Sequence, residues 1–213
     1  MASQGSETLP SPKQTLEAAE AVALAMTDKH YAVVGGAACS VLGSVRQTSD
    51  VDFVVLQGDT KAARALLKAQ DRSFEVEKGT NHTYYKSSPR VEIEILTPPA
   101  LFKQPFTSST PTINVDKIRV LKPTLLLDAK CGTIFSRSSE EKRRTDATDI
   151  KFLLRWCTTN RMHPTAEELP NVTKEFVEYF ISQFGGAELW TAAGYDHVQG
   201  ACHRPFLRQQ LMD

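Results

Sequence analysis

The sequence has few of the features that would assign a class of protein at once. Its 213 residues include four cysteines that lie far apart, with no CxxC pair and no Cys/His cluster. This spacing disfavours structural zinc and a disulfide framework. It predicts four reduced, mostly buried thiols, which are typical of cytoplasmic or nuclear proteins. We therefore expect a cytoplasmic location, with a nuclear one left open, and buried thiols at Cys39, Cys131, Cys157 and Cys202.

Net charge and long apolar runs are also missing. The chain has 25 basic and 25 acidic residues, so a strong overall attraction to nucleic acid or anionic lipid is not indicated, although a local basic patch stays open. No run approaches the roughly 20 apolar residues of a membrane helix, and the polar N-terminus has no signal-peptide core. With 41% apolar and 23% charged residues, the composition is that of an ordinary globular protein without a membrane partner.

The first half of the chain predicts an α/β fold. Helical spacing of apolar residues and short apolar or alternating runs follow one another after a leader, residues 1–12, that we expect to be disordered. A hairpin among the strands favours a mixed sheet over a purely parallel one. The expected helices are 13–28, 37–43 and 58–71, the last capped by Asp59 or Thr60. The expected strands are 31–34, 50–56, 73–79, 82–88 and 90–96.

The second half predicts mostly helices. A proline-rich loop at 97–111 and one or two short strands within 112–121 come first. We therefore expect an α/β domain over 13–120 and a helical extension over 121–213 packed on it, with little pattern after residue 186. The expected helices of the extension are 124–137, 140–157 and 171–184.

Acidic residues recur on two predicted strands. Asp50 and Asp52 lie two apart, so their side chains point to the same side of a strand. Glu92 and Glu94 share one face of the later strand V-E-I-E-I, and either could join them if the strands are neighbours. Carboxylates that lie side by side repel each other unless a cation sits between them, most often a divalent metal with oxygen ligands.

These motifs resemble the nucleotidyltransferase superfamily, which has the DNA polymerase β-like fold. The shared pattern is an apolar strand, Gly35-Gly36, a helix, and then Asp-Val-Asp on the next strand. The phrase R-x-T-x-D-V-D-F is similar to that of small abortive-infection and toxin–antitoxin nucleotidyltransferases. Their helical C-terminal half carries a lysine, an arginine and a T-D-x-x-D-I run, matched here by Lys130, by Arg137 or Arg143, and by residues 145–150.

The resemblance implies an enzyme that moves a nucleoside monophosphate from a nucleoside triphosphate, such as ATP, to an acceptor hydroxyl. It implies Mg²⁺ or Mn²⁺ held by Asp50, Asp52 and a third acid, for which Glu94 is preferred to Glu92 because Ile95-Leu96 follows it. The turn at Gly35-Gly36 would expose backbone N–H groups to the phosphates. The other nucleotide-binding candidates are Ser40, Arg46 and Lys130, and Arg46 could instead order the loop before Asp50.

Three alternatives to this catalytic interpretation stay open at the level of the sequence. The Gly-Gly pair could be an ordinary turn and the two aspartates a structural device. The chain could have this fold but serve as a catalytically inactive binding or regulatory partner. It could also be an unrelated α/β domain. The acceptor is not indicated: a small molecule, a protein side chain and an RNA end all fit, although zero net charge does not point to nucleic acid.

Overall fold

The structure, a computed structural model, describes residues 9–202. The chain forms two compact units that divide between Lys122 and Pro123. The α/β architecture with a mixed sheet, expected from the sequence, is confirmed in the first unit. None of the helices within residues 9–202 is both long enough and apolar enough to cross a lipid bilayer.

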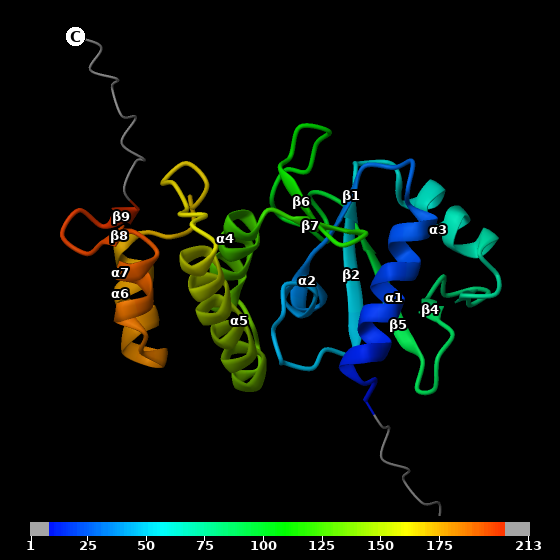
Figure 1. Ribbon diagram of the computed structural model, residues 1–213, viewed down its shortest axis with the longest axis horizontal. Coiled ribbons are helices and arrows are strands. Elements are labelled where there is room, and N and C mark those ends of the chain that lie inside the picture. The colour runs from blue at the N-terminus through cyan, green and yellow to red at the C-terminus, as the bar shows by residue number, and fades with distance from the viewer. Residues whose placement is uncertain (1–8, 203–213) are drawn as a thin grey trace, which may run out of the picture. The chain divides into compact units, whose positions relative to one another are not determined.

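A seven-stranded sheet in the order β3-β4-β5-β2-β1-β7-β6 forms the centre of the first unit (Figure 1). β2 is parallel to β5 and antiparallel to β1, and β1 is parallel to β7, so the sheet is mixed. The hairpin β3–β4 is confirmed. The strands are β1 Tyr31–Val33, β2 Asp50–Val55, β3 Phe74–Val76, β4 Thr83–Tyr85, β5 Val91–Leu96, β6 Thr112–Val115 and β7 Ile118–Leu121.

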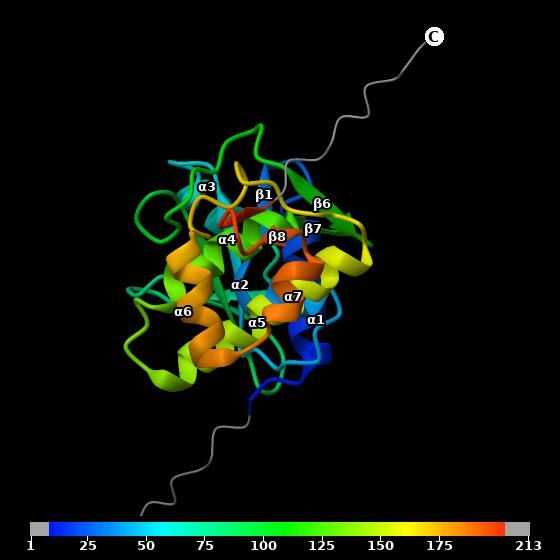
Figure 2. The same cartoon turned by 90° about the vertical axis from the view of Figure 1, so that its left-hand side faces the viewer.

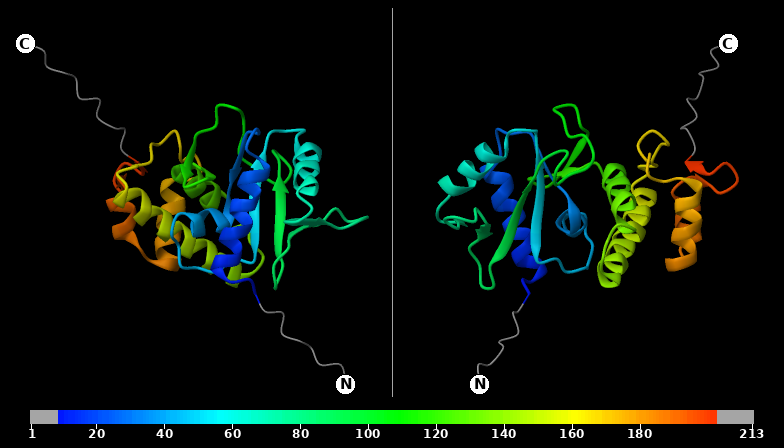
Figure 3. Two further views of the ribbon diagram at one scale, coloured as in Figure 1. Left: turned by 45° about the vertical axis from the view of Figure 1, so that its right-hand side comes forward. Right: turned by 180° about the vertical axis from the view of Figure 1, so that it is seen from behind.

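Three helices pack against this sheet: α1 (Pro12–Ala25), α2 (Gly35–Val41) and α3 (Thr60–Ala69). α1 and α3 lie along the same side of β2, with α2 on the other side (Figure 3). Ser11 caps α1 with a complete capping box, so the chain is already structured at residue 11 of the expected leader. Residues 1–8 of that leader lie outside the described part.

Two local expectations in the first unit need correction. The helix predicted to begin at Ala37 begins at Gly35, two residues earlier. Gly35 has a φ of +65°, a left-handed conformation that glycine adopts readily, so the chain turns from β1 into the helix at this residue. Asp59 occupies the N-cap position of α3, but its side chain makes no capping hydrogen bond, since its own backbone is already close to helical (φ −86°, ψ −3°).

The second unit is a set of helices with one short β-ribbon. α4 (Pro123–Ile134) packs on α5 (Glu140–Thr159), and α6 (Lys174–Phe184) and α7 (Ala187–Ala192) follow. Ser139 caps α5, as expected. The ribbon of β8 (Tyr195–Asp196) and β9 (Ala201–Cys202) adjoins α7 (Figure 2).

The sequence missed α7 and the ribbon, because each is too short to repeat an apolar pattern. The buried residues Trp190 and Tyr195 nevertheless place this segment in the core of the unit. The tail after residue 202, for which little pattern was expected, lies outside the described part. The prediction of buried cysteines is confirmed at all four positions.

Candidate active site

The register of β2 against β5 brings the acidic residues together. Asp50 lies opposite Glu92, and Asp52 lies opposite Glu94, in adjacent parallel strands. Residues opposite each other in neighbouring strands point to the same face of the sheet. The four carboxylates therefore form two rows on one face, while Val51 and its neighbours fill the buried face. The expectation that these strands are neighbours is confirmed.

Contacts distinguish the two candidate third acids. Glu92 Oε1 lies 3.1 Å from Nδ1 of His82, so this carboxylate already has a partner outside the row. Glu94 shares a side-chain hydrogen bond with Asp52. Partial burial of its carboxyl group, although the residue as a whole is exposed, raises the pKa of Glu94, and the negative charges of Asp50 and Glu92 raise it further.

The pair of Asp52 and Glu94 fits a divalent cation in its chemistry. Two carboxyl groups can share a hydrogen bond only when one of them holds a proton. A divalent cation can replace that proton, because it satisfies the oxygens of both groups at once. As the side chains lie, however, residues 9–202 contain no group of three or more His, Cys, Asp or Glu side chains arranged as a ligand set. A metal held by Asp50, Asp52 and Glu94 together therefore stays a prediction.

Gly35 follows β1 and sits directly against the Asp52 carboxylate. The backbone N–H of Val34 donates to the Asp52 carbonyl oxygen at 2.9 Å, which holds the turn against β2. Gly35 has a positive φ, and a Cβ atom at this position would collide with the carboxylate of Asp52. A Cβ atom at Gly36 would meet the side chains of Arg46 and Thr48. Gly35 is thus required for the close approach to Asp52 as well as for its positive φ, whereas a side chain at Gly36 would have to displace the flexible end of Arg46 and the Thr48 hydroxyl.

Replacement of Gly35 by alanine is expected to lower stability and to disturb the site together. The left-handed conformation costs a non-glycine residue about 1–2 kcal/mol, and the collision with Asp52 adds about 1–3 kcal/mol of packing strain. Gly58→Ala is the matched control, because Gly58 also has a positive φ (+93°) but no atom lies within 4 Å of the position that an added methyl group would take. Urea denaturation of both variants measures the difference. Equal losses of stability would contradict the tight contact between Gly35 and Asp52.

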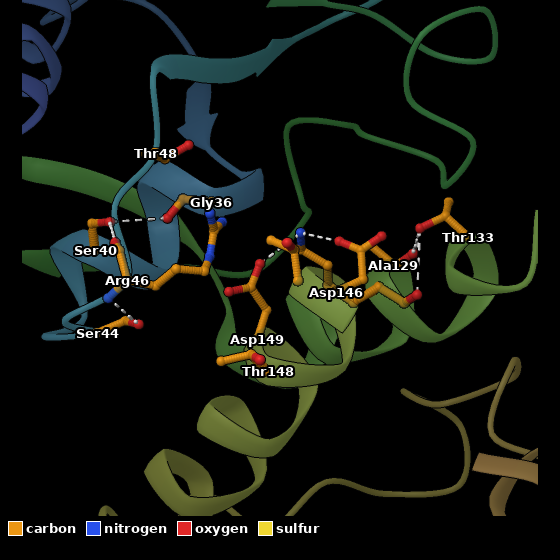
Figure 4. A network of polar contacts seen from close by, with 12 residues as sticks. Gly36, Ser40, Ser44, Arg46, Thr48, Ala129, Thr133, Asp146, Thr148 and Asp149 are labelled. Atoms are coloured by element: carbon orange, nitrogen blue, oxygen red, sulfur yellow. Dashed lines mark hydrogen bonds and ion pairs between the residues drawn. The ribbon is translucent and has the colours of Figure 1, made fainter. Parts of the chain in front are cut away.

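Ser40 and Arg46 order the loop that leads into β2 (Figure 4). The Ser40 hydroxyl can donate to the carbonyl oxygen of Gly36 (3.2 Å) or of Arg46 (3.3 Å). Arg46 Nη1 donates to the Gln47 carbonyl oxygen at 2.7 Å. The structure therefore shows the loop-ordering role that the sequence left open for Arg46. A role of Ser40 or Arg46 in nucleotide binding stays a prediction.

Lys130 belongs to the second unit, where it binds two buried aspartates, Asp146 and Asp149. Both aspartates are labelled in Figure 4. The Nζ of Lys130 lies 2.6 Å from Asp146 and 2.8 Å from Asp149, and Asp146 also accepts from Arg137 Nε at 2.7 Å. Burial alone would lower the pKa of Lys130, but the charges of Asp149 and Asp146 outweigh it and raise the pKa. The expected pairing of these aspartates with Lys or Arg is confirmed. Contact of Lys130 with phosphates stays a prediction.

Sequence reasoning missed the side chains that support the carboxylate rows. Thr48 Oγ1 donates to Asp50 Oδ1 at 2.7 Å, and the Thr48 carbonyl oxygen accepts from Thr15 of α1 at 3.0 Å. In β4, Tyr84 lies opposite Glu92, with the Arg90 guanidinium 3.7 Å from the centre of its ring. Of these, the sequence pointed only to Thr48, as part of the phrase R-x-T-x-D-V-D-F, and it did not indicate the contact with Asp50.

Comparisons with known proteins identify the fold. The first similar solved structure is an antigenic nucleotidyltransferase-like protein from Paracoccidioides brasiliensis (TM-score 0.66, 20% identity, 87% of this chain and 94% of that one). JHP933 from Helicobacter pylori is also similar (TM-score 0.59, 14% identity, 90% and 94%). A candidate nucleotidyltransferase from H. pylori gives a TM-score of 0.58 at 14% identity, over 93% and 97% of the two chains.

Sequence comparisons add nothing to this likeness. No protein-family model matches the chain, and no curated protein matches it. At identities of 20% or less, similarity of structure establishes the fold and leaves the chemistry to the residues of the site. The nucleotidyltransferase-like fold expected from the sequence is confirmed.

Proposed function

We propose that this chain, which has the nucleotidyltransferase-like fold, transfers a nucleoside monophosphate from a nucleoside triphosphate to an acceptor hydroxyl. One observation carries the proposal: the β2–β5 register sets Asp52 opposite Glu94, and their carboxyl groups share a hydrogen bond on the same face as Asp50. A fold with many uses does not require this arrangement, whereas the chemistry does.

In this proposal Asp50, Asp52 and Glu94 hold Mg²⁺ or Mn²⁺. When bound, the metal stabilises the negative charge that develops on the attacking oxygen, the α-phosphate and the leaving pyrophosphate. The turn at Gly35 supports this assignment, because it brings the backbone to the Asp52 carboxylate and no side chain caps the start of α2. Its N–H groups are therefore suited to bind phosphate oxygens.

The reaction needs a base for the acceptor. The hydroxyl oxygen forms a bond to the α-phosphorus, the bond to pyrophosphate breaks, and the hydroxyl proton passes to a carboxylate. Glu94 is the proposed base, because the β2–β5 register places it on the same face as Asp50 and Asp52, beside the position proposed for the metal and the acceptor hydroxyl. The acceptor is a hydroxyl compound whose identity the site does not specify.

The test begins with each of the four labelled nucleoside triphosphates. We expect release of pyrophosphate, or self-labelling of the protein, with one of them in Mg²⁺ or Mn²⁺, and its loss in excess EDTA. Isothermal titration with a non-hydrolysable triphosphate measures binding separately. Neither binding nor pyrophosphate release with any of the four would overturn the proposal.

A second candidate is a nucleotide-binding protein without transfer activity. It is favoured by one observation: within the described residues no three-ligand metal group is already in place. This candidate predicts that a triphosphate binds with the same affinity in EDTA and in Mg²⁺, and that no pyrophosphate is released. The titration and the release assay together distinguish the two candidates.

A further inference from the structure

A groove on the first unit lies between α3 and the hairpin β3–β4. Its volume is about 530 Å³, and it is lined by Lys61, Arg64, Ala65, Lys68, Val76 and Asn81. We call this the α3 groove. Three of the six side chains are cationic and none is acidic, in a chain whose total charge is zero.

The α3 groove is on the opposite face of the sheet from the candidate active site. Val76 lies opposite Thr83, which lies opposite Ile93, so these three side chains share one face. Glu92 and Glu94 flank Ile93 in β5 and point to the other face. The groove therefore does not belong to the carboxylate site and would leave it free.

The cations of the groove lack partners of their own. Within residues 9–202, neither Lys61, Arg64 nor Lys68 makes an ion pair or a side-chain hydrogen bond, and Nε of Arg64 is buried with no acceptor. A buried donor without an acceptor costs free energy, the more so on a charged group. An anion in the groove would offset the charges of these three side chains, and a phosphate matches the planar fork of an arginine guanidinium especially well.

Nearby acids do not neutralise the groove. Glu75 alternates with Phe74 and Val76 in β3, so it points to the opposite face of the sheet. Glu77 binds Arg90 Nη1 at 3.2 Å and Thr80 Oγ1 at 3.2 Å. Glu75 and Glu77 therefore do not offset the positive charges of the groove, and an anionic ligand could do so.

The spacing of the cations indicates more than one phosphate. Lys61 and Lys68 are seven residues apart on α3, which separates them by roughly 10 Å along the helix. A cluster that binds one small anion converges on a point, whereas the backbone positions of these three residues follow one another along the helix axis. Grooves that bind single-stranded nucleic acid combine such a line of cations with contacts to successive phosphates. An anionic membrane surface needs a larger cluster of about four to eight cations.

We propose that the α3 groove binds the phosphodiester backbone of a single-stranded nucleic acid. The lining contains no aromatic side chain, so it offers no platform for a base, and binding is expected to be independent of sequence. It is also expected to be the same for RNA and DNA, because the contacts are to phosphates. The site is separate from nucleotidyl transfer and stands whether or not the chain is catalytic.

The test is fluorescence anisotropy with labelled oligo(rU) and oligo(dT) of about 15 nucleotides, enough to span a site of this kind, using the full chain with EDTA and no nucleotide. The groove variant carries Lys61→Gln, Arg64→Gln and Lys68→Gln. The matched control carries Lys29→Gln, Lys103→Gln and Lys117→Gln, three exposed lysines of the same unit outside the groove. Both variants lose three positive charges. A difference in binding between them therefore reports the groove residues and not the change in net charge.

We expect the groove variant to weaken binding at least tenfold and the control less than about twofold. Three phosphate contacts to a single strand predict a slope near −2 for the logarithm of the binding constant against that of the salt concentration. The groove variant should bring this slope close to zero. If Arg64→Gln disturbs folding, the double variant Lys61→Gln/Lys68→Gln changes exposed rim residues only, and the slope should still fall by more than half.

Three results would overturn the proposal. The first is an absence of binding to both oligonucleotides at about 50 mM salt, where phosphate contacts are strong. The second is an equal loss in the groove and control variants. The third is equal or tighter binding, with the same loss in the groove variant, of a polyglutamate of the same length or of vesicles containing phosphatidylserine. That result would assign the groove to an acidic peptide or a lipid surface instead.

Discussion

Replacement of Lys130 by methionine is expected to lower the free energy of unfolding of the second unit by about 3–5 kcal/mol. Only 4% of the Asp146 side chain and none of the Asp149 side chain is exposed, and Lys130 contacts both. Removal of Lys130 takes away a cation that both carboxylates share, while Arg137 still contacts Asp146. A buried carboxylate that loses its cation must either stay charged at high cost or take up a proton.

Both tryptophans of the chain, Trp156 and Trp190, lie in the second unit, so their fluorescence during urea denaturation reports this unit. Arg144→Met is the control, because Arg144 pairs with Glu140 on the surface, where both side chains are more than 70% exposed. It should cost less than about 0.5 kcal/mol.

A rescue experiment distinguishes the two possible causes of the stability loss in Lys130→Met, namely the unpaired buried charge and the lost packing of the side chain. The triple variant Lys130→Met, Asp146→Asn and Asp149→Asn removes the buried charges together and should regain much of the loss. Lys130→Met with wild-type stability but weakened binding of a triphosphate would be the opposite outcome. It would assign Lys130 to the nucleotide and contradict the structural role.

Asp52→Asn is expected to abolish transfer without destabilising the protein. The amide has nearly the shape of the carboxylate and can donate a hydrogen bond to Glu94, so the contact between β2 and β5 is kept. The amide N–H takes the place of the shared proton, so the pair adds no repulsion to a face that also carries Asp50 and Glu92. The proposed metal loses a charged ligand, and a loss of several kcal/mol of transition-state stabilisation lowers the rate by at least about a hundredfold.

The measurements are the rate of pyrophosphate release and the midpoint of thermal unfolding. We expect the rate to fall while the midpoint stays the same or rises. Glu92→Gln is the control on the same face: it removes one charge, but from a side chain that binds His82. It should keep most of the rate. An active Asp52→Asn variant would contradict the proposed role of Asp52 as a metal ligand. An equal loss of rate in both variants would show that the rate depends on the total negative charge of this face and not on Asp52 itself.

The sequence predicted the elements of the site better than their contacts. Alternation along residues 50–56 and 90–96 was enough to place acids on one face of each strand. The choice between Glu92 and Glu94 depends on the register of parallel strands roughly forty residues apart, for which no local pattern exists. The partners of Lys130 likewise depend on how two helices pack.

The α3 groove could not be predicted from the sequence for a different reason. Lys61, Arg64 and Lys68 recur at helical spacing in the sequence, on the face of α3 opposite its apolar residues. A solvated helix face has the same pattern, so nothing in the sequence distinguishes these three cations from ordinary surface charges. Only the hairpin β3–β4, which closes the other side, turns that face into a groove.

The parallel pairing of β2 with β5 also bears on how the chain folds. Its antiparallel neighbour β1 ends 17 residues before β2 begins, since Val33 precedes Asp50, whereas Asp52 meets Glu94 only after 42 further residues. Pairings of large sequence separation close late, because their loop entropy must be overcome first. During synthesis, β1 and β2 can thus associate before β5 has left the ribosome. The carboxylates therefore come close enough to repel each other only in a late folding step, when β5 pairs with β2 and the apolar face of β2 is already packed.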